Sequence, residues 1–325
     1  MKKNIAVVGC GHWGKNLVRN FSELGSLLAV CDPDKNVSKK MADLFGVQVL
    51  SFEDILLNKT IEGVVLAVPA SLHADMAIKA MTAAKHVYVE KPLAMNNDEA
   101  QLMIESSHKN NVKLMVGHLL QYHPAFIKTK EIVLNGGIGK VNYIYSNRLS
   151  FGKVRSEEDV IWSFAPHDIS MVLSLAQGKP KSVLSKCSCI IQEKIADTGL
   201  IHIDFEDGLR AHISVSWIHP FKEQRLVVVG SKGALVFDDT KPWKDKLILH
   251  SHEIDKSNDQ LNVRQTNTNN IFVPESEPLK NECQHFVDVV NSSLDPKTSA
   301  AEGQSVLKIL SAATLSQNIN KSVNI

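Results

Sequence analysis

Two side chains far apart in the sequence have the chemistry needed to oxidise an alcohol. Lys91 directly follows an apolar, strand-like run at 86–90, and an ammonium there could hydrogen-bond a substrate hydroxyl and stabilise the alkoxide that develops on it. His167 lies in Trp162-Ser163-Phe164-Ala165-Pro166-His167-Asp168 and could accept the hydroxyl proton while hydride leaves the same carbon. Each has an ordinary alternative: Lys91 as a surface lysine before a loop proline, and His167 as a helix-terminal residue that bonds backbone.

A glycine-rich turn near the start of the chain could hold the hydride acceptor. Gly9, Gly11 and Gly14 follow the spacing G-x-G-x-x-G between a strand-like run at 4–8 and a helix-like run at 15–24. The first glycine permits a tight turn, the second lets a pyrophosphate approach the backbone, and the third lets the helix pack closely on the strand. The helix N-terminus then attracts the phosphates. The pattern predicts a dinucleotide site; the alternative is an ordinary turn that carries three glycines.

Asp32 indicates which dinucleotide would bind. It ends the second strand-like run, 18 residues after Gly14, where a carboxylate accepts hydrogen bonds from both ribose hydroxyls and repels a 2′-phosphate. Pro33 follows, where an arginine could have favoured NADP, so we expect NAD. The residues expected to contact the cofactor are Gly9, Gly11, His12, Trp13, Gly14, Asp32, Val68, Pro69, Ser71, His73, Glu90 and Lys91.

The second half of the chain offers candidates for the substrate. A diphosphate or carboxylate would need cations, and arginine binds such groups with two hydrogen bonds. The residues expected to contact the substrate are Tyr122, Arg148, Arg155, Trp162, Asp168 and Arg225. The arginines could instead be solvated, and Tyr122 could be linker packing. His73, like these, has a plain alternative as a polar residue in the first turn of a helix. No H-E-x-x-H or similar metal pattern occurs, so we expect no metal.

The elements that must position these residues change character near residue 122. Residues 1–121 alternate strand and helix, which predicts a Rossmann domain: a doubly wound parallel sheet that binds ligands at the carboxyl ends of its strands. Residues 122–325 contain successive strand-like segments, which predict a C-terminal α+β domain for substrate binding and oligomerisation, with a large open, mainly antiparallel sheet.

Three features of the second domain are more specific expectations. Pro166 suits a first helical turn, so we expect a helix at 166–176 that is capped by Ser163 and has His167 at its start. The polar range 241–278 is expected to be a long loop with one strand at 246–250. The last helix, at 302–318, could pack back on the first domain.

Composition narrows the classes of partner. The 325 residues carry a net charge of +1, which gives no electrostatic case for nucleic acid or an anionic membrane. No apolar stretch approaches the length of a membrane span, and Met1-Lys2-Lys3 runs into the first strand without a cleavage site. We therefore expect a cytoplasmic protein that acts on a small molecule.

The glycine fingerprint, the Glu90-Lys91-Pro92 triplet and a histidine near residue 167 before an antiparallel sheet together resemble the glucose–fructose oxidoreductase / inositol dehydrogenase family (Gfo/Idh/MocA). The resemblance implies that Lys91 is the catalytic lysine and His167 the catalytic acid/base. Many members carry an aspartate four residues before that histidine. This chain has Ser163 there, so His167 would act alone or with Asp168.

Within that family, the segments 11–16 and 162–170 are most similar to sugar-nucleotide enzymes such as UDP-N-acetylglucosamine 3-dehydrogenases. This implies NAD-dependent oxidation of the 3-hydroxyl of a UDP-linked N-acetyl aminosugar, before an aminotransferase in surface-glycan or lipopolysaccharide synthesis. Relatives pair through the open sheet, which implies a homodimer or homotetramer. The alternatives are a dehydrogenase of a free polyol or sugar, such as an inositol, and a non-catalytic dinucleotide-binding sensor.

Overall fold

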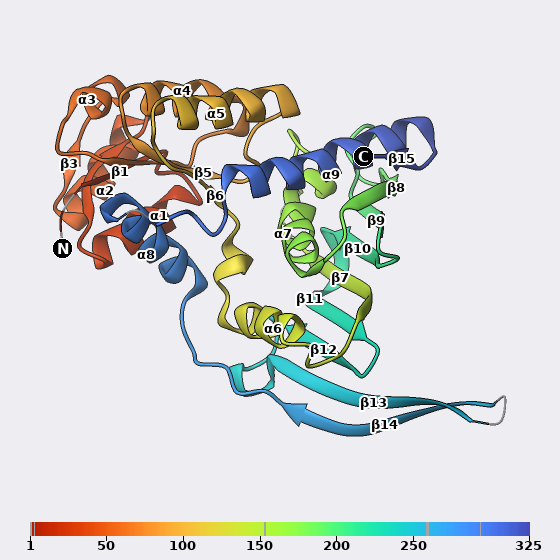
Figure 1. Cartoon of the computed structure of the whole chain (residues 1–325). Coiled ribbons are helices and arrows are strands. Elements are labelled where there is room, and N and C mark those ends of the chain that lie inside the picture. Colours follow the sequence, from red (N-terminus) through yellow and green to blue (C-terminus); the bar gives the residue numbers. More distant parts are fainter. Residues whose placement is uncertain (1, 3, 153, 258–259, 293) are drawn as a thin grey trace. The chain divides into compact units, whose positions relative to one another are not determined.

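The chain forms two compact units (Figure 1). The computed structural model describes residues 2, 4–152, 154–257, 260–292 and 294–325, and side chains outside 254–261. Unit 1 comprises residues 1–122 and 276–307, and unit 2 comprises residues 123–275 and 308–325. The first boundary thus lies one residue from the expected one. From the sequence, only the last helix was expected to pack back on the first domain. In the structure the whole range 276–307 belongs to unit 1.

Unit 1 contains the predicted doubly wound sheet. Its six strands are all parallel, in the order β3-β2-β1-β4-β5-β6. The strands are β1 (Ile5–Val8), β2 (Leu27–Cys31), β3 (Gln48–Val49), β4 (Gly63–Leu66), β5 (His86–Glu90) and β6 (Leu114–Gly117). The chain order reverses between β1 and β4, and a parallel sheet opens a ligand crevice at the carboxyl ends of its strands at such a point. The predicted fold of this half is confirmed.

Some helices of unit 1 begin directly after a residue whose side chain caps them. Ser51 accepts a hydrogen bond from the Asp54 N–H at 3.0 Å, and Asn96 accepts one from Glu99 at 2.9 Å, so both act as N-caps. The helices are α1 (Gly14–Glu23), α2 (Lys35–Phe45), α3 (Phe52–Leu57), α4 (His73–Thr82), α5 (Asn97–Lys109), α8 (Pro278–Asn291) and the first turns of α9 (Ala300–Ile319), with the short turns η1 (Ala70–Leu72) and η2 (Leu119–Tyr122).

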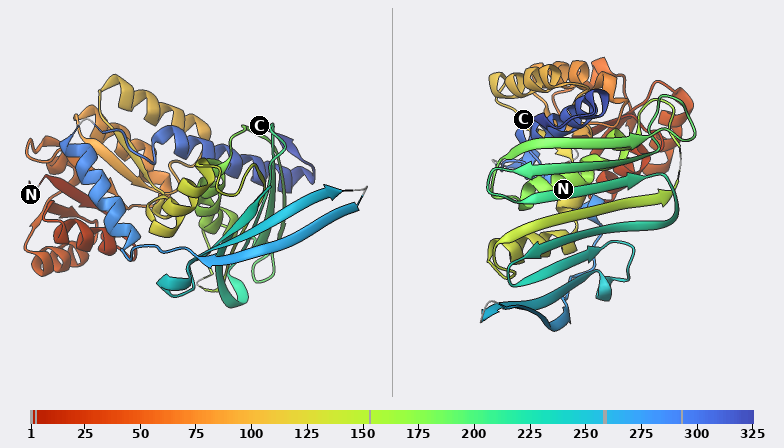
Figure 2. Two further views of the ribbon diagram at one scale, coloured as in Figure 1. Left: turned by 60° about the horizontal axis from the view of Figure 1, so that its bottom comes forward. Right: turned by 90° about the vertical axis from the view of Figure 1, so that its right-hand side faces the viewer.

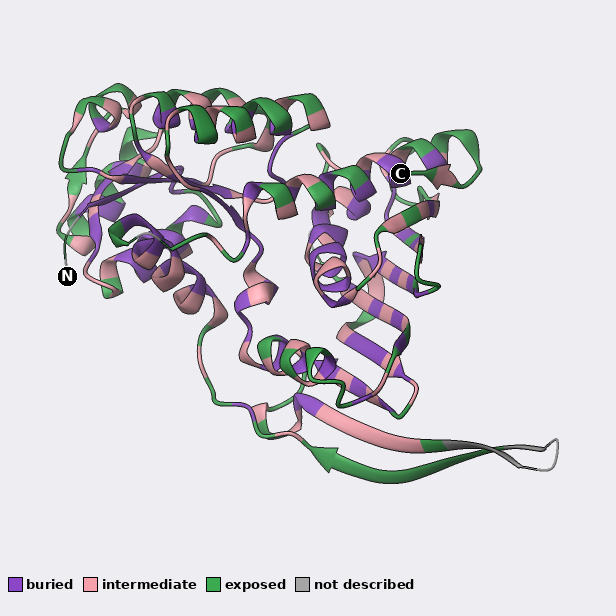
Figure 3. Cartoon of the chain, viewed as in Figure 1, coloured by how far each residue is buried: buried purple, intermediate pink, exposed green. Residues whose placement is uncertain are grey.

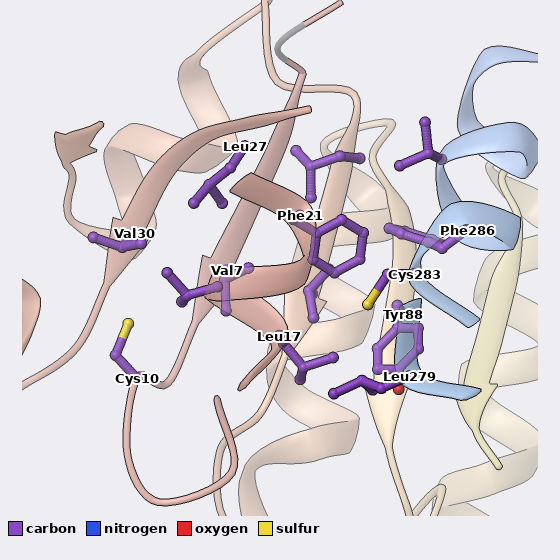
Figure 4. Close-up of a cluster of buried hydrophobic side chains, with 14 of the residues drawn as sticks. Val7, Cys10, Leu17, Phe21, Leu27, Val30, Tyr88, Leu279, Cys283 and Phe286 are labelled. Atoms are coloured by element: carbon purple, nitrogen blue, oxygen red, sulfur yellow. The ribbon is translucent and has the colours of Figure 1, made fainter. Parts of the chain in front are cut away.

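The helix α8 completes the core of unit 1 although it comes late in the chain. Phe286 packs edge-on against Phe21 and Tyr88, with ring centroids 6.2 and 5.7 Å away (Figure 4). All three rings are fully buried, and a buried phenylalanine contributes roughly 1.5–3 kcal/mol. The apolar spacing of α8 predicts an amphipathic helix, but spacing alone does not say which core the helix joins.

Unit 2 is built on a nine-stranded mixed sheet, and Figure 2 shows its strands side by side. The order is β14-β13-β12-β11-β7-β10-β9-β8-β15; β7 and β10 pair in parallel and the other neighbours are antiparallel. The strands are β7 (Val141–Phe151), β8 (Pro180–Ser188), β9 (Thr198–Phe205), β10 (Arg210–Ser216), β11 (Ile218–Gly230), β12 (Gly233–Asp238), β13 (Leu247–Ser257), β14 (Gln260–Asn270) and β15 (Val323–Asn324). The predicted mainly antiparallel sheet is confirmed.

The strand expected at 246–250 is present as the start of β13, but the expectation that the rest of 241–278 is a long loop is wrong. After the short turn η3 (Trp243–Asp245), β13 and β14 form a hairpin that extends the sheet; residues 258–259 of the range lie outside the described residues. Residues 262–270 of β14 are exposed throughout (Figure 3). A strand that buries neither face needs no apolar alternation, so its sequence reads as polar loop.

The helix that carries His167 is longer than predicted. α6 (Pro124–Leu134) has the expected bounds, but α7 runs over Val160–Leu175, and Asp159 caps it by accepting the Trp162 N–H at 2.9 Å. Pro166 therefore lies inside the helix. Proline has no N–H and crowds the carbonyl four residues before it, which is why the pattern favoured a helix start there. The predicted Ser163 cap is wrong, and His167 lies two turns into α7.

A partly buried ion cluster in unit 2 gives a first prediction. Asp239 binds His123 at 3.2 Å and Lys246 at 2.7 Å, and despite burial these two donors lower the pKa of Asp239 to about 2. An unfolded aspartate titrates near about 3.9, so this stabilisation is complete above about pH 4 and is lost as the pH falls toward 2. Asp239→Asn should lower the free energy of unfolding by about 2 kcal/mol at neutral pH, and by much less near pH 2.

Urea unfolding of the wild type and the variant across this pH range measures that difference. Asp75→Asn is the control, because Asp75 pairs with Lys79 on the surface at 63% exposure and should have little effect. A difference that stays constant with pH would contradict the assignment.

None of the helices among the described residues combines the length and apolarity of a membrane-crossing segment.

Candidate functional site

The glycine turn of unit 1 has the geometry that a bound pyrophosphate requires. Gly9 has φ +90°, and a Cβ there would lie 2.4 Å from the Ala67 carbonyl oxygen. A Cβ on Gly14 would lie 1.9 Å from the Gly9 oxygen, so only glycine lets α1 start this close to β1. Gly11 is exposed, and a Cβ there would meet nothing within 4 Å. The backbone at Gly11 is thus open to a ligand in front of the α1 N-terminus, whose first turn carries no acidic residue.

Asp32 is fixed at the same edge of the sheet. One carboxylate oxygen accepts the Cys10 N–H at 2.7 Å, and the other accepts the Asp34 N–H at 2.9 Å. These bonds hold the carboxylate beside the glycine turn, while the side chain stays partly exposed. A carboxylate at the end of β2 is the group that binds ribose hydroxyls in this type of sheet. The glycine turn and Asp32 therefore fit a dinucleotide without a 2′-phosphate.

Lys91 follows β5 at this edge and is partly buried. Its neighbour Glu90 accepts hydrogen bonds from Trp13 Nε1 at 2.6 Å and from the Tyr88 hydroxyl at 3.0 Å. Trp13 belongs to the glycine turn, so the turn and the Lys91 segment are directly bonded. Burial raises the pKa of Glu90, against the lowering effect of these donors and of Lys91. The peptide bond between Lys91 and Pro92 is cis.

The remaining cofactor candidates divide between exposed and buried positions. Pro69 and Ser71 are exposed in the loop after β4, and Val68 is partly buried there; His12 is exposed in the glycine turn. His73 differs, because it is only 1% exposed and both ring nitrogens face backbone carbonyls. These contacts occupy both ring nitrogens, so they give no support to the expectation that His73 contacts the cofactor.

Sequence reasoning missed an acidic group behind Glu90. Glu282 on α8 is 1% exposed, and burial together with the charge of Glu90 raises the pKa of Glu282 well above its usual range. Tyr88, which bonds Glu90, also interacts with Glu282. The sequence did contain a signal for this group: Glu282 occupies a buried position on a helix face that is otherwise apolar, and glutamate is seldom fully buried.

In unit 2, Asp168 is occupied by a buried ion pair. Its carboxylate accepts hydrogen bonds from Arg148 Nε at 2.6 Å and Nη2 at 3.2 Å, and from the Ser146 hydroxyl. Asp168 is 1% exposed and the Arg148 side chain 12%. His167, the next residue of α7, is partly buried. Asp168 therefore anchors α7 to β7. These contacts give no support to the expectations that Asp168 contacts the substrate or assists His167.

Arg225 lies on the face of the sheet opposite to Arg148. Successive residues of a strand point to opposite faces, so Ser146 and Arg148, which bond Asp168 of α7, share one face and Asn147 lies on the other. Arg225 pairs directly with Asn147 across the strand ladder and therefore lies on the Asn147 face. The Arg225 guanidinium binds Asp238 at 3.0 Å and Glu223 at 3.4 Å beside a hollow of about 430 Å³ on that face. Because the sheet separates Arg148 from Arg225, the two cannot hold one diphosphate within this unit, and that expectation is corrected.

The other substrate candidates have structural partners. Arg155 is half-exposed and pairs with Glu158 at 2.8 Å. The Trp162 indole N–H donates to Thr314 of α9 at 3.0 Å. In unit 1, the buried Tyr122 hydroxyl lies 3.0 Å from the Thr298 hydroxyl. Tyr122 thus packs as a linker residue, the alternative that the sequence left open.

Comparison with known proteins agrees with this geometry. The family model described as "Oxidoreductase family, NAD-binding Rossmann fold" matches residues 3–118, and the "GFO/IDH/MocA C-terminal domain" matches residues 126–236. A UDP-N-acetylglucosamine 3-dehydrogenase of Acidithiobacillus ferrooxidans is 26% identical over 68% of this chain and 69% of its own. A myo-inositol 2-dehydrogenase of Thermotoga maritima is 24% identical over 99% of this chain and 98% of its own.

The solved structure of UDP-N-acetylglucosamine 3-dehydrogenase GnnA from Acidithiobacillus ferrooxidans shares the fold, with a TM-score of 0.85 at 21% identity over 97% of this chain and 98% of that one. One family model matches most of the first predicted half of the chain, and the other matches residues 126–236 of the second. The chain therefore belongs to the GFO/IDH/MocA family of oxidoreductases, and its unit 1 is an NAD-binding Rossmann domain.

Proposed function

We propose that this protein is an NAD-dependent dehydrogenase that oxidises the 3-hydroxyl of a UDP-linked N-acetyl aminosugar to the 3-keto sugar nucleotide. The observation that carries the dehydrogenase assignment is the edge of the unit 1 sheet. There the open glycine turn, the fixed Asp32 and the Glu90-Lys91 segment all follow carboxyl ends of parallel strands, and Trp13 joins the turn to Glu90.

Each proposed chemical role belongs to a named side chain. NAD, when bound, supplies a nicotinamide that can take up hydride. The Lys91 ammonium hydrogen-bonds the substrate hydroxyl and stabilises negative charge as it develops on that oxygen. His167 accepts the hydroxyl proton, for which an imidazole is suited near neutral pH. Ser163, one turn before His167, cannot act as the second carboxylate that many relatives have there.

Support for the sugar nucleotide comes from the similarity to the UDP-N-acetylglucosamine 3-dehydrogenase and from the segments 11–16 and 162–170. The second candidate is oxidation of a free polyol such as myo-inositol. Two observations favour it: the inositol relative matches nearly the whole chain, and Arg148 and Arg225 are both paired with carboxylates. Neither arginine is therefore a spare cation for a diphosphate.

A substrate panel tests the proposal. The purified protein is mixed with NAD and UDP-N-acetylglucosamine, its C6 carboxylate analogue, or myo-inositol, and the absorbance of the reduced nicotinamide is followed. We expect turnover with a UDP sugar. Turnover of myo-inositol alone would establish the second candidate. NAD binding without turnover of any sugar or polyol would instead indicate the sensor function.

Asp32 gives a prediction about cofactor choice. Asp32→Ser removes both acceptor oxygens, and a hydrogen bond to a charged group contributes about 1.5–3 kcal/mol. The dissociation constant for NAD should therefore rise by roughly ten- to a hundredfold, while NADP binding improves because the carboxylate no longer repels its phosphate. Titration of both cofactors by protein fluorescence measures the ratio.

The matched control is Asp34→Ser, two residues further along. Asp34 caps α2 by accepting the Asn36 N–H at 2.9 Å, and serine is also a good cap. This variant should bind NAD as the wild type does. An unchanged NAD-to-NADP preference in Asp32→Ser would contradict the role assigned to Asp32.

Two further proposals concern partners. A 3-keto sugar is a substrate for transamination, so we place an aminotransferase after this reaction in surface-glycan synthesis. We also propose a homodimer or homotetramer that pairs through the sheet of unit 2. Its face away from α7 carries Tyr143 and Tyr145, with ring centroids 6.1 Å apart, and Leu200, which is 48% exposed. Light scattering measures the oligomeric state, and a monomer at micromolar concentration would contradict it.

A further inference from the structure

The imidazole of His73 joins two loops that leave neighbouring strands of unit 1. His73 begins α4, and its Nδ1 lies 2.8 Å from the carbonyl oxygen of Pro92, the residue after Lys91. Its Nε2 lies 3.0 Å from the carbonyl oxygen of Val68, in the loop after β4. The strands β4 and β5 are adjacent, with Leu66 opposite Val89. One ring therefore bridges the loop that precedes α4 and the loop that carries Lys91.

The chemistry of this contact makes it a strong constraint. Both partners are carbonyl oxygens, which only accept hydrogen bonds, so a neutral ring donates to one of them and an imidazolium to both. The ring is 1% exposed, and a buried carbonyl that loses its donor has no water to replace it. Burial and the nearby Lys91 ammonium lower the pKa of His73, while the bonds to both carbonyls raise it.

We propose that His73 is a positioning residue for Lys91: by holding the Pro92 carbonyl it fixes the backbone from which the Lys91 side chain reaches the substrate. The inference rests on the proposed function for the assignment of Lys91 to the reaction. Misplacement of a reacting group by about 1 Å can cost about a hundredfold in rate. Substrate and cofactor contacts made by other residues would remain.

The test compares three variants of the full-length protein with the wild type. His73→Leu fills the space but cannot donate to either carbonyl, and kcat should fall by about a hundredfold while KM and the NAD dissociation constant change by less than about threefold. His73→Asn keeps a donor near the position of Nδ1, so it should regain at least tenfold of that loss, on the order expected for one restored hydrogen bond.

The control is His86→Leu. His86 begins β5, at the other end of the strand that leads to Lys91, and its Nδ1 accepts the Lys113 N–H at 3.0 Å. This variant also loses a bond between a ring on β5 and the backbone, here to the residue that precedes β6, but at the edge opposite the glycine turn. Its kcat should match that of the wild type.

Hydrogen–deuterium exchange provides a readout that does not depend on activity. In His73→Leu, the peptide covering 91–95 should exchange at least tenfold faster, with the strands of unit 1 unchanged. Unchanged exchange in that peptide, or a kcat equal to the wild type, would overturn the inference. An inactive wild-type protein whose 91–95 segment still loosens in His73→Leu would overturn only the proposed function.

Discussion

Replacing Lys91 with methionine should lower kcat by about a thousandfold while the dissociation constant for NAD changes by less than about threefold. Methionine keeps the length and the apolar stem of lysine but has no ammonium. Loss of one preorganised donor to a developing oxyanion costs about 10²–10³ in rate, and because the Lys91 donor also carries a positive charge we expect the upper end of that range. Cofactor binding should persist because the glycine turn and Asp32 make it.

Steady-state rates and fluorescence titration with NAD measure the two quantities separately. The control is Lys79→Met: Lys79 lies on the exposed surface of α4 and pairs with Asp75 at 2.7 Å, so its loss should leave kcat unchanged. Lys91→Arg keeps the charge on a longer, planar group and should recover only part of the rate. Turnover by Lys91→Met at the wild-type rate would remove the lysine from the mechanism.

The unit 1 site could be predicted because every signal it needs is local. A strand, three spaced glycines and a helix lie within 24 residues, and each glycine has the steric role that its position predicts. The alternation of strand and helix then places Asp32 and Lys91 at one edge, because parallel strands end at the same side of a sheet. The sequence did not predict that Trp13 bonds Glu90, since this contact depends on the order in which the strands lie side by side.

Unit 2 was harder to predict because strand register decides which face a side chain occupies. Arg148 and Arg225 lie in β7 and β11, and a shift of one residue in strand pairing would move a side chain to the opposite face of the sheet. The register of β7 with β11 sets Ser146 opposite Leu226 and Asn147 opposite Arg225. No local pattern in either strand determines this register. The sequence alone therefore does not distinguish which face of the sheet each arginine occupies.

Breaking the Arg148–Asp168 pair should give the largest loss of stability. Arg148→Met leaves the Asp168 carboxylate, which is 1% exposed, with the Ser146 hydroxyl but without its cation. Removal of one partner of a buried ion pair costs about 3–5 kcal/mol, because the remaining charge stays uncompensated in a poorly solvated place. Urea unfolding followed by circular dichroism measures the loss, which should affect the transition that includes α7 and β7.

The double variant Arg148→Met/Asp168→Leu separates the effect of lost charge pairing from that of lost packing. It removes the unpaired carboxylate as well as the arginine, and replacing both partners of a buried ion pair by apolar residues often leaves stability unchanged. It should recover most of the stability that Arg148→Met loses. Arg210→Met is the exposed control: Arg210 pairs with Asp204 at 3.3 Å in the same sheet, but its side chain is 70% exposed, so the loss should stay below about 1 kcal/mol. If Arg148→Met were no more destabilising than Arg210→Met, Asp168 would not need its cation, and the carboxylate would again be available to assist His167.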